Sequence, residues 1–296
     1  GGSKARYVLG HQLPTWNKSV LDRWLKRAFE RADPTRLAVP HSGVLPHLPL
    51  LDGTDSHFYF GWYHGDATDI DKLAERLPRL VRFLSEFGAQ AAPSAPGPEF
   101  IDADAWPDLD WEQLAERYGA QRWVFDERVP PESFATFEEW RHATQVYQAE
   151  LIKHHVELLR RIKYRPTGGF AVFSFNEPGP AIGWGVLDHR GRPKLGWEAL
   201  RRACAPVLIA ADRPPAIVEP GQKLALDVHV VNDLREPLTG EVSAVVRWAG
   251  GRREWRFGGD VDADSVVRVG RLRCSVPDTL GKLELDLRLT ADGVEV

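Results

Sequence analysis

Two hydrophobic patterns divide the chain near residue 206. Before that point, helical and short strand-like segments alternate, which is typical of an α/β fold. One helical stripe lies between Asn17 and Asp33. Its apolar members are Val20, Leu21, Trp24, Leu25, Ala28 and Phe29. The strand candidates of this half are residues 37–41, 57–63, 80–86 and 170–175.

Two capping boxes predict the starts of further helices. Asp110 precedes Gln113 by three positions, and Thr136 precedes Glu139 by the same interval. In such a pair the first side chain accepts a hydrogen bond from the backbone N–H of the second residue, which fixes a helix N-terminus. The second box opens the longest predicted helix. Its apolar stripe consists of Trp140, Ala143, Tyr147, Leu151, Leu158 and Ile162.

After Pro206 the hydrophobic period changes to two. Apolar and polar residues alternate over residues 224–230, 242–248 and 283–289, and glycine- or proline-containing turns separate the runs. Several short strands with one apolar face predict a β-sandwich. We therefore expect a domain boundary here, with residues 1–205 in one domain and residues 206–296 in the other.

Composition excludes several classes of protein. The 296 residues carry 38 Lys and Arg against 42 Asp and Glu, with no basic cluster, so we expect no nucleic-acid partner. No apolar run is long enough to cross a membrane. The two cysteines, Cys204 and Cys274, exclude a disulfide-rich scaffold and a cysteine-based zinc site. The adjacent His154 and His155 face different sides of the predicted helix and cannot form an i, i+4 zinc pair.

The most informative segment ends in Glu86. An apolar predicted strand delivers this carboxylate, and Gly88 follows two residues later, as at the C-terminal end of a barrel strand. A glutamate at a strand end is on its own most often a salt-bridge partner. Residues 55–65 upstream and 168–188 downstream, both rich in aromatic and polar residues, give it more weight.

Five blocks resemble, in order, the C-terminal half of a glycoside hydrolase family 2 catalytic domain. They are Asp33-Pro34-Thr35-Arg36, His41-Ser42-Gly43, Trp62-Tyr63-His64-Gly65, Ser85-Glu86-Phe87-Gly88, and Gly185-Val186-Leu187-Asp188 with Gly191-Arg192-Pro193-Lys194. The β-mannosidase-like branch is the most similar, over roughly residues 12–210. The resemblance implies that residues 1–205 form the second half of a (β/α)8 TIM barrel. It also implies an immunoglobulin-like sandwich for residues 206–296.

The resemblance also implies site residues. Glu86 matches the catalytic nucleophile of a retaining glycosidase, which works with a second, protonated carboxyl group about 5–5.5 Å away. Trp62 and Trp184 resemble walls of the sugar subsite, although either could be a core residue. His41 and His64 resemble partners for sugar hydroxyls, or are structural. We expect no cofactor and no metal.

The second carboxyl group has no clear match. The family's acid/base residue lies in an Asn-Glu pair before the nucleophile, whereas the single Asn-Glu pair here is Asn176-Glu177, after Glu86. At that later position the family usually has Asn-Asp near a Trp-Pro, so the sugar preference stays open. We interpret Asn176 as a subsite residue and Glu177 as strand-end support. Residues 10–14 could be a decayed acid/base motif, but more simply lead into the next helix.

These observations predict a glycosidase that hydrolyses terminal β-linked sugars with retention, as β-mannosidases do. We expect a fragment whose acid/base strand precedes residue 1, completed by the missing N-terminal half or by a second copy of the chain. One alternative is β-galactosidase or β-glucuronidase specificity on the same fold. Another is a non-catalytic sugar-binding pseudo-enzyme. The sequence leaves linkage, oligomeric state and compartment open, and favours a soluble cytoplasmic protein over a secreted one.

Overall fold

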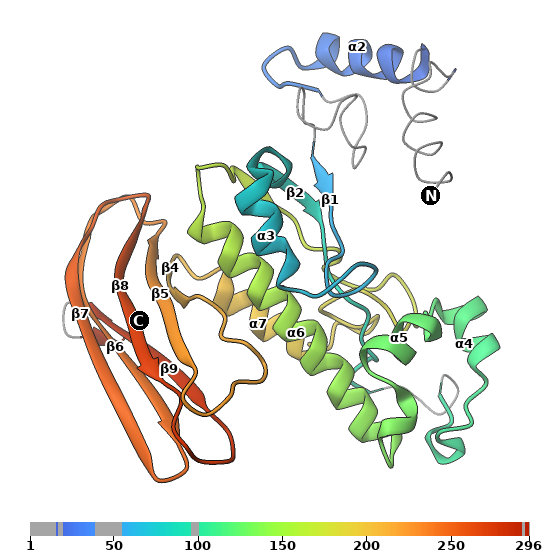
Figure 1. Ribbon diagram of the computed structural model, residues 1–296. Helices are drawn as coiled ribbons and strands as arrows, with labels where there is room; N and C mark the ends of the chain where they lie inside the picture. Colours follow the sequence, from blue (N-terminus) through green and yellow to red (C-terminus); the bar gives the residue numbers. More distant parts are fainter. Residues whose placement is uncertain (1–15, 17–19, 39–54, 96–100, 292–293, 296) are drawn as a thin grey trace.

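The computed structural model describes residue 16 and residues 20–38, 55–95, 101–291 and 294–295. They form a mixed α/β structure with one parallel sheet, packed against helices, and two antiparallel sheets (Figure 1). Its helices are α2 (Asp22–Ala32), α3 (Asp69–Arg76), α4 (Trp111–Tyr118), α5 (Arg122–Arg128), α6 (Phe137–Arg161) and α7 (Leu195–Ala203). No helix in the described ranges is long and apolar enough to cross a membrane.

The parallel sheet holds three short strands in the order β1-β2-β3. They are β1 (Ser56–His57), β2 (Phe83–Glu86) and β3 (Gly169–Phe170). The central strand, β2, pairs with β1 on one side and with β3 on the other. Its residue Leu84 lies opposite Ser56 of β1 and opposite Phe170 of β3. The three C-terminal ends therefore lie at one edge, and loops far apart in the sequence meet there.

Helices α3 and α6 pack against this sheet with apolar side chains. Ile70 of α3, Leu84 of β2 and Ile152 of α6 are fully buried in one cluster, which continues through Val186. Both capping boxes form as predicted, because the side chain of Asp110 accepts from Gln113 N and that of Thr136 accepts from Glu139 N. The long helical stripe after Thr136 is confirmed as α6.

Three of the predicted strands of this half are longer than the strands that form. The segment 57–63 leaves the sheet after His57, because Gly61 adopts φ +79° and the chain turns back with three N–H groups bonded to Tyr59 O. The segment 80–86 begins as a 3-10 helix, Pro78–Val81, before β2. Of segment 170–175, Phe170 alone is in a strand. Leu37 and Ala38 are not in a strand, and residues 39–41 lie outside the described residues.

Longer strands follow α7 and form two antiparallel sheets. They are β4 (Val207–Ala211), β5 (Lys223–Asn232), β6 (Leu238–Trp248), β7 (Gly251–Val261), β8 (Ser265–Ser275), β9 (Glu284–Ala291) and β10 (Val294–Glu295). One sheet has the order β4-β5-β8 and the other β10-β9-β6-β7. Val228 and Val230 from the first sheet and Val242 and Leu289 from the second share one buried cluster, so the sheets pack face to face. The three alternating runs predicted from the sequence are confirmed as β5, β6 and β9.

Candidate active site

Glu86 is the last residue of β2, at the edge where the parallel strands end. Its side chain is 32% exposed, so solvent can reach the carboxylate, while Leu84 of the same strand is fully buried. His57 is its partner in the register with β1, and Phe58 N donates to Glu86 O at 3.1 Å. The carboxylate thus belongs to the central strand, β2, and the backbone of Glu86 is hydrogen-bonded to the segment that follows β1.

Two side chains from the β1 segment hold one oxygen of this carboxylate. Tyr59 Oη donates to Glu86 Oε2 at 2.8 Å, and His57 Nδ1 lies 3.1 Å from the same oxygen. Neither a hydrogen bond nor an ion pair with another described residue engages Oε1. A carboxylate with one oxygen fixed and one oxygen open is suited to nucleophilic attack, because its orientation is set before substrate arrives.

A second layer supports His57. Its Nε2 lies 3.6 Å from Asp55 Oδ2, and the Ser85 hydroxyl donates to the same Asp55 oxygen. Both ring nitrogens of His57 therefore face carboxylate oxygens, which fixes the plane of the ring.

Tyr59 stays protonated beside Glu86. Burial raises the pKa of the Tyr59 phenol well above its usual range, and the hydrogen bond to Glu86 raises it further. The phenol is therefore a hydrogen-bond donor to Glu86 at neutral pH.

Aromatic rings pack against the ring of Tyr59. The ring centroid of Tyr59 lies 5.0 Å from that of Trp184 and 5.3 Å from that of Tyr63. Trp184 also contacts Trp62, at 5.7 Å, and is itself partly exposed. The structure thus brings Trp62 and Trp184 together with Glu86 through Tyr59, a residue that the sequence analysis did not select.

The other residues selected from the sequence lie in different settings. Trp62 is only 1% exposed and donates through Nε1 to Gln121 Oε1 at 3.0 Å, so packing is the role that the structure displays. His64 is exposed beside Tyr63. Asn176 is exposed and, among the described residues, makes no hydrogen bond with Glu86. His41 lies outside the described residues.

Glu177 is buried in an ion pair. Its Oε1 accepts from Gly185 N at 2.6 Å and lies 3.3 Å from Lys194 Nζ, and the two side chains are 7% and 0% exposed. Lys194 Nζ also donates to Ala91 O and Gly183 O, and burial lowers the pKa of this amine. A Cβ at Gly183 would lie 2.6 Å from the carboxylate oxygens, so only glycine leaves room for Glu177. These contacts agree with structural support rather than with proton transfer at Glu86.

Gly88 allows close approach behind the site. It adopts φ +154°, and a Cβ there would lie 2.4 Å from Phe173 O. Phe173 N in turn donates to Phe87 O at 3.0 Å. The glycine after the carboxylate therefore lets the segment after β3 pack against the end of β2.

The sequence analysis missed Asp55, His57 and Tyr59 as site residues. A signal was present, because three polar residues at alternate positions project to one face of an extended segment. The sequence does not say which residues this face meets. That depends on the pairing of β1 with β2, which places His57 opposite Glu86.

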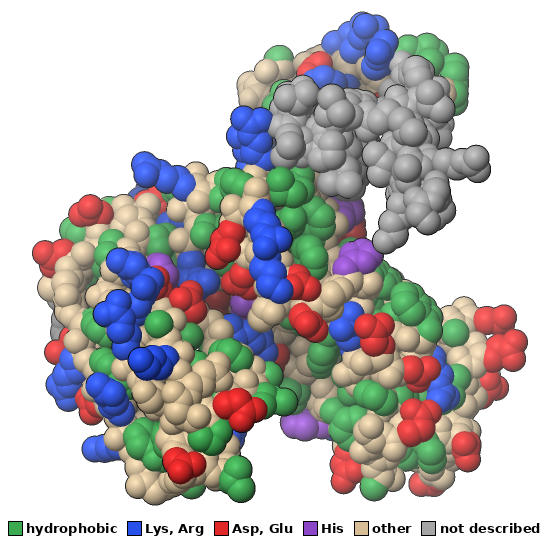
Figure 2. Space-filling view, in the orientation of Figure 1, with side chains coloured by type: hydrophobic (Ala, Val, Ile, Leu, Met, Phe, Trp, Pro, Cys, Tyr) green, Lys and Arg blue, Asp and Glu red, His purple; other side chains and the backbone are tan. Residues whose placement is uncertain are grey.

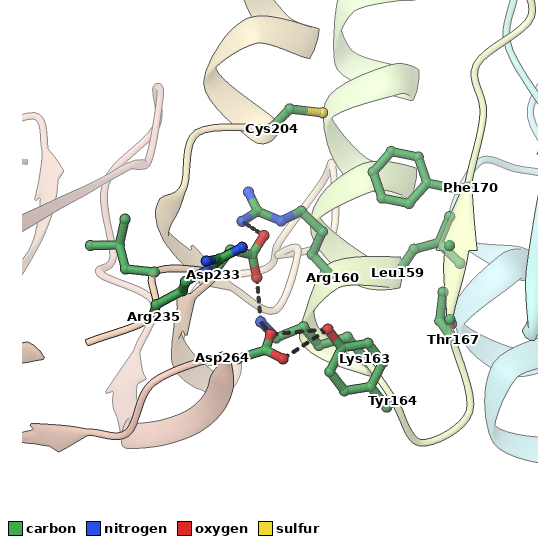
Figure 3. A pocket seen from close by; sticks show the side chains of 13 residues that line it. Leu159, Arg160, Lys163, Tyr164, Thr167, Phe170, Cys204, Asp233, Arg235 and Asp264 are labelled. Atoms are coloured by element: carbon green, nitrogen blue, oxygen red, sulfur yellow. Dashed lines mark hydrogen bonds and ion pairs between the residues drawn. The ribbon is translucent and has the colours of Figure 1, made fainter. Parts of the chain in front are cut away.

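A pocket of about 460 Å³ lies at the opposite end of the parallel strands, between the end of α6 and the antiparallel sheets (Figure 3). Arg160 Nη2 and Lys163 Nζ bind Asp233, which follows β5, and Lys163 also binds Asp264 at 3.1 Å. Tyr164 donates to Asp264 at 3.0 Å. These charges neutralise each other, so the cluster joins α6 to the loops of the antiparallel sheets.

No group of three or more His, Cys, Asp or Glu side chains in the described ranges could hold a metal ion. His154 and His155 indeed diverge: His154 Nε2 contacts Asp71 Oδ2 at 2.7 Å, whereas His155 Nε2 contacts Ala67 O at 3.1 Å.

Several known proteins with a similar sequence are β-mannosidases. A β-mannosidase B from Thermothelomyces thermophilus is 31% identical over 227 residues, which cover 65% of this chain and 25% of the relative. A β-mannosidase B from Emericella nidulans is 29% identical over 256 residues, 80% of this chain and 28% of the relative. The chain is β-mannosidase-like. It spans only about a quarter of the length of these relatives, and no family model matches it.

Solved structures support the same architecture for this β-mannosidase-like chain. The β-D-mannosidase of Dictyoglomus thermophilum superposes with a TM-score of 0.68 over 95% of this chain and 34% of its own, at 20% identity. The exo-chitosanase CsxA of Amycolatopsis orientalis gives a TM-score of 0.53 over 72% of this chain and 26% of its own, at 14% identity. At such identities the similarity establishes the fold alone.

Proposed function

We propose that this chain carries the nucleophile and part of the sugar site of a retaining glycoside hydrolase that acts on terminal β-linked mannosides. The observation that carries the proposal is the Glu86 carboxylate, fixed by Tyr59 and His57 at the end of a parallel strand. Similarity to β-mannosidases over more than half of the chain supports the choice of sugar.

The proposed architecture follows the same similarity. Residues 1–205 are the C-terminal part of a (β/α)8 barrel, to which β1, β2 and β3 contribute consecutive strands. Residues 206–296 are an immunoglobulin-like module. The register and order of the three parallel strands support the first part, and the two face-to-face antiparallel sheets support the second. The missing N-terminal half, or a second copy of the chain, completes the barrel.

In the proposed reaction, Glu86 Oε1 attacks the anomeric carbon and the bond from that carbon to the leaving oxygen breaks. A covalent glycosyl–Glu86 ester forms, and a water molecule then hydrolyses it with net retention. Tyr59 keeps its proton and holds Oε2 throughout, while His57 limits rotation of the carboxyl group. Trp184 supplies an aromatic face beside the sugar, with His64 and Asn176 as hydroxyl partners at the rim and Trp62 as the packing behind that face. His41 belongs to the same proposed set.

The proton for the leaving oxygen comes from outside this set of residues. Glu177, the carboxylate of the single Asn-Glu pair, is buried against Lys194 and points into the fold. This observation favours a second candidate, a sugar-binding protein without turnover. The specificity alternatives, β-galactosides and β-glucuronides, use the same nucleophile.

Covalent trapping tests the proposal without needing the acid/base residue. The chain is incubated with 2,4-dinitrophenyl 2-deoxy-2-fluoro-β-mannoside, whose leaving group needs little protonation, and is examined by intact and peptide mass spectrometry. We expect one fluoromannosyl group on the peptide that contains Glu86, and none in Glu86→Gln.

The matched control is Glu198→Gln, which removes an exposed carboxylate paired with Arg201 and Arg202 and should label normally. Sugar binding without any labelling would favour the non-catalytic candidate. Faster labelling by the galactoside or glucuronide analogue would change the assigned sugar.

A further inference from the structure

Gln148, in the middle of α6, is a polar residue that is 0% exposed. Charged side chains, by contrast, are spread over the face of the molecule shown in Figure 2. Burying an amide costs free energy unless its hydrogen bonds are formed within the protein. The partners of Gln148 should therefore show why a polar residue occupies this position.

The amide group of Gln148 joins two loops that end at the candidate active site. Its Nε2 donates to Ala89 O at 2.9 Å and to Trp184 O at 3.1 Å, and it lies 3.5 Å from Gly185 O. Ala89 follows Glu86 by three positions, and Trp184 is the aromatic residue proposed to face the sugar. One side chain thus bridges the loop after the candidate nucleophile and the loop of the aromatic wall.

The surroundings of this amide fix its orientation. Carbonyl oxygens lie around the nitrogen, whereas Oε1 is buried and accepts no hydrogen bond from any described residue. A reversed amide would place its oxygen against the carbonyl oxygens. An unpaired buried acceptor is unfavourable, so the donated bonds are what a glutamine contributes here. A side chain of similar length without an N–H group could fill the space but could not join the loops.

Other bonds hold the same loop. Lys194 Nζ donates to Gly183 O at 3.1 Å, and Trp184 O also accepts from Ser174 N at 3.2 Å. Loss of the Gln148 amide should therefore displace the indole of Trp184 without unfolding the loop.

The position of this indole matters because it lies close to the candidate nucleophile. The ring centroids of Trp184 and Tyr59 are 5.0 Å apart, and Tyr59 donates to Glu86. The carboxylate is oriented separately, by Tyr59 and His57. Movement of Trp184 should therefore weaken the hold on the sugar more than it lowers the reactivity of the carboxylate.

We propose that Gln148 is a positioning residue that sets the distance between the Trp184 face and the Glu86 carboxylate, and so determines how tightly the sugar is held. This inference rests on the proposed function, since Trp184 faces a sugar only if Glu86 attacks one. It gives a role in substrate positioning to a buried residue of α6.

The test is covalent labelling of the 296-residue chain by 2,4-dinitrophenyl 2-deoxy-2-fluoro-β-mannoside. Rates at several reagent concentrations give two constants, the maximal rate constant of labelling and the half-saturating concentration of the reagent. In Gln148→Met we expect the half-saturating concentration to rise about tenfold and the rate constant to change less than about threefold. The reason is that the loop of Trp184 moves while the carboxylate stays oriented.

Gln145→Met is the matched control. Gln145 lies three residues earlier on α6, is 3% exposed, and donates through Nε2 to Ala92 O at 2.9 Å. Its substitution removes the same kind of buried hydrogen bond, but not one to the loop of Trp184. Both labelling constants should equal those of the wild type.

Gly196→Ala displaces the same amide without removing it. A Cβ at Gly196, on α7, would lie 2.6 Å from Gln148 Oε1, so the amide must shift. Alanine favours a helix more than glycine does, so α7 should form. The half-saturating concentration should rise as in Gln148→Met, and this variant decides the test if Gln148→Met does not fold.

Near-UV circular dichroism gives a readout that needs no sugar. Gln148→Met should change the aromatic spectrum of the wild type, and the same substitution made in Trp184→Phe should not, because the indole that moves is then absent.

The outcomes separate this inference from the proposed function. Unchanged labelling constants in Gln148→Met and Gly196→Ala would overturn the inference while labelling of the wild type upholds the function. An equal rise of the half-saturating concentration in Gln145→Met would overturn it by showing a general disturbance of α6. A lower rate constant at an unchanged half-saturating concentration would overturn it by assigning the effect to Glu86. A wild type that is not labelled removes the proposed function and the sugar-holding role with it.

Discussion

The strands that carry Glu86 are two to four residues long, whereas β5 to β9 run for eight to eleven residues. The long strands form regular antiparallel ladders, in which backbone hydrogen bonds and one shared apolar layer provide the order. The short strands cannot order their surroundings in this way. Their connecting loops need other partners.

Side chains supply those partners around the parallel sheet. Gln148 Nε2 donates to Ala89 O at 2.9 Å, and Thr167 Oγ1 donates to Val81 O at 2.7 Å. Such bonds fix irregular backbone and so allow loops from distant parts of the chain to converge at one strand edge. The loops around the short parallel strands, rather than the long antiparallel strands, can therefore bring distant residues together in one site.

The largest effect on stability should come from breaking a buried ion pair on the parallel-sheet side. Glu177→Gln removes the ion-pair partner of the buried Lys194 ammonium group, although the amide can still accept from Gly185 N. We expect the free energy of unfolding to fall by about 3–5 kcal/mol. Urea denaturation followed by circular dichroism measures it.

The corresponding change on the antiparallel side is Glu284→Gln. Glu284 pairs with Lys282 on the surface of β9, so its loss should leave the unfolding midpoint unchanged. If both substitutions destabilise equally, side-chain partners are no more important around the parallel sheet than in the ladders.

This difference also explains what the sequence could predict. Alternation over residues 224–230, 242–248 and 283–289 depends only on which face of a strand is buried, and it located three long strands correctly. The turn at Gly61 and the 3-10 helix after Pro78 interrupt apolar runs that resemble strands when read locally. Their ends depend on contacts with remote residues.

The candidate site shows the same limit. Glu86 was selected because strand, carboxylate and glycine are contiguous in the sequence, and the motif resemblance reinforced it. Tyr59 donates to Glu86 across 27 positions of the sequence, so this relation appears only once the chain has folded. The motif resemblance left Trp62 as either a subsite wall or a core residue, and its 1% exposure involves Phe125 of α5, a helix that the sequence analysis did not predict.

A second prediction removes one donor from the candidate nucleophile. Tyr59→Phe keeps the ring contacts with Trp184 but leaves Glu86 Oε2 without the phenol hydrogen bond. We expect covalent labelling of Glu86 by the fluoromannoside to slow about 100-fold, because the carboxylate is less well oriented and stabilised for attack. The labelling rate from timed mass spectra measures this.

Tyr164→Phe provides the control on the other side of the molecule. Tyr164 also donates to a carboxylate, Asp264, but at the junction between α6 and the antiparallel sheets. Its removal should leave the labelling rate unchanged. Equal slowing in both variants would mean that the Tyr59 bond has no special role at Glu86.

The smallest predicted effect is a difference in acid sensitivity between a buried and a half-buried histidine. His155 on α6 packs against Phe87, and burial lowers its pKa to about 3, with a further contribution from the neighbouring His154. The unfolded chain binds a proton at this residue below about pH 6.5, whereas the folded chain does not until about pH 3. The contribution of His155 to the free energy of unfolding is therefore fully present above pH 6.5. It falls by about 2 kcal/mol between pH 7 and pH 5.

The measurement is the free energy of unfolding of the wild type and of His155→Gln at pH 7, 6 and 5. The substitution can lower stability by a constant amount at every pH, but the decrease between pH 7 and pH 5 should be smaller than in the wild type by about these 2 kcal/mol. Burial also lowers the pKa of His229, on β5, but that residue is less completely buried, so His229→Gln should flatten the slope less. If His229→Gln flattened it more, acid sensitivity would belong to the antiparallel sheets rather than to the helix that covers the site.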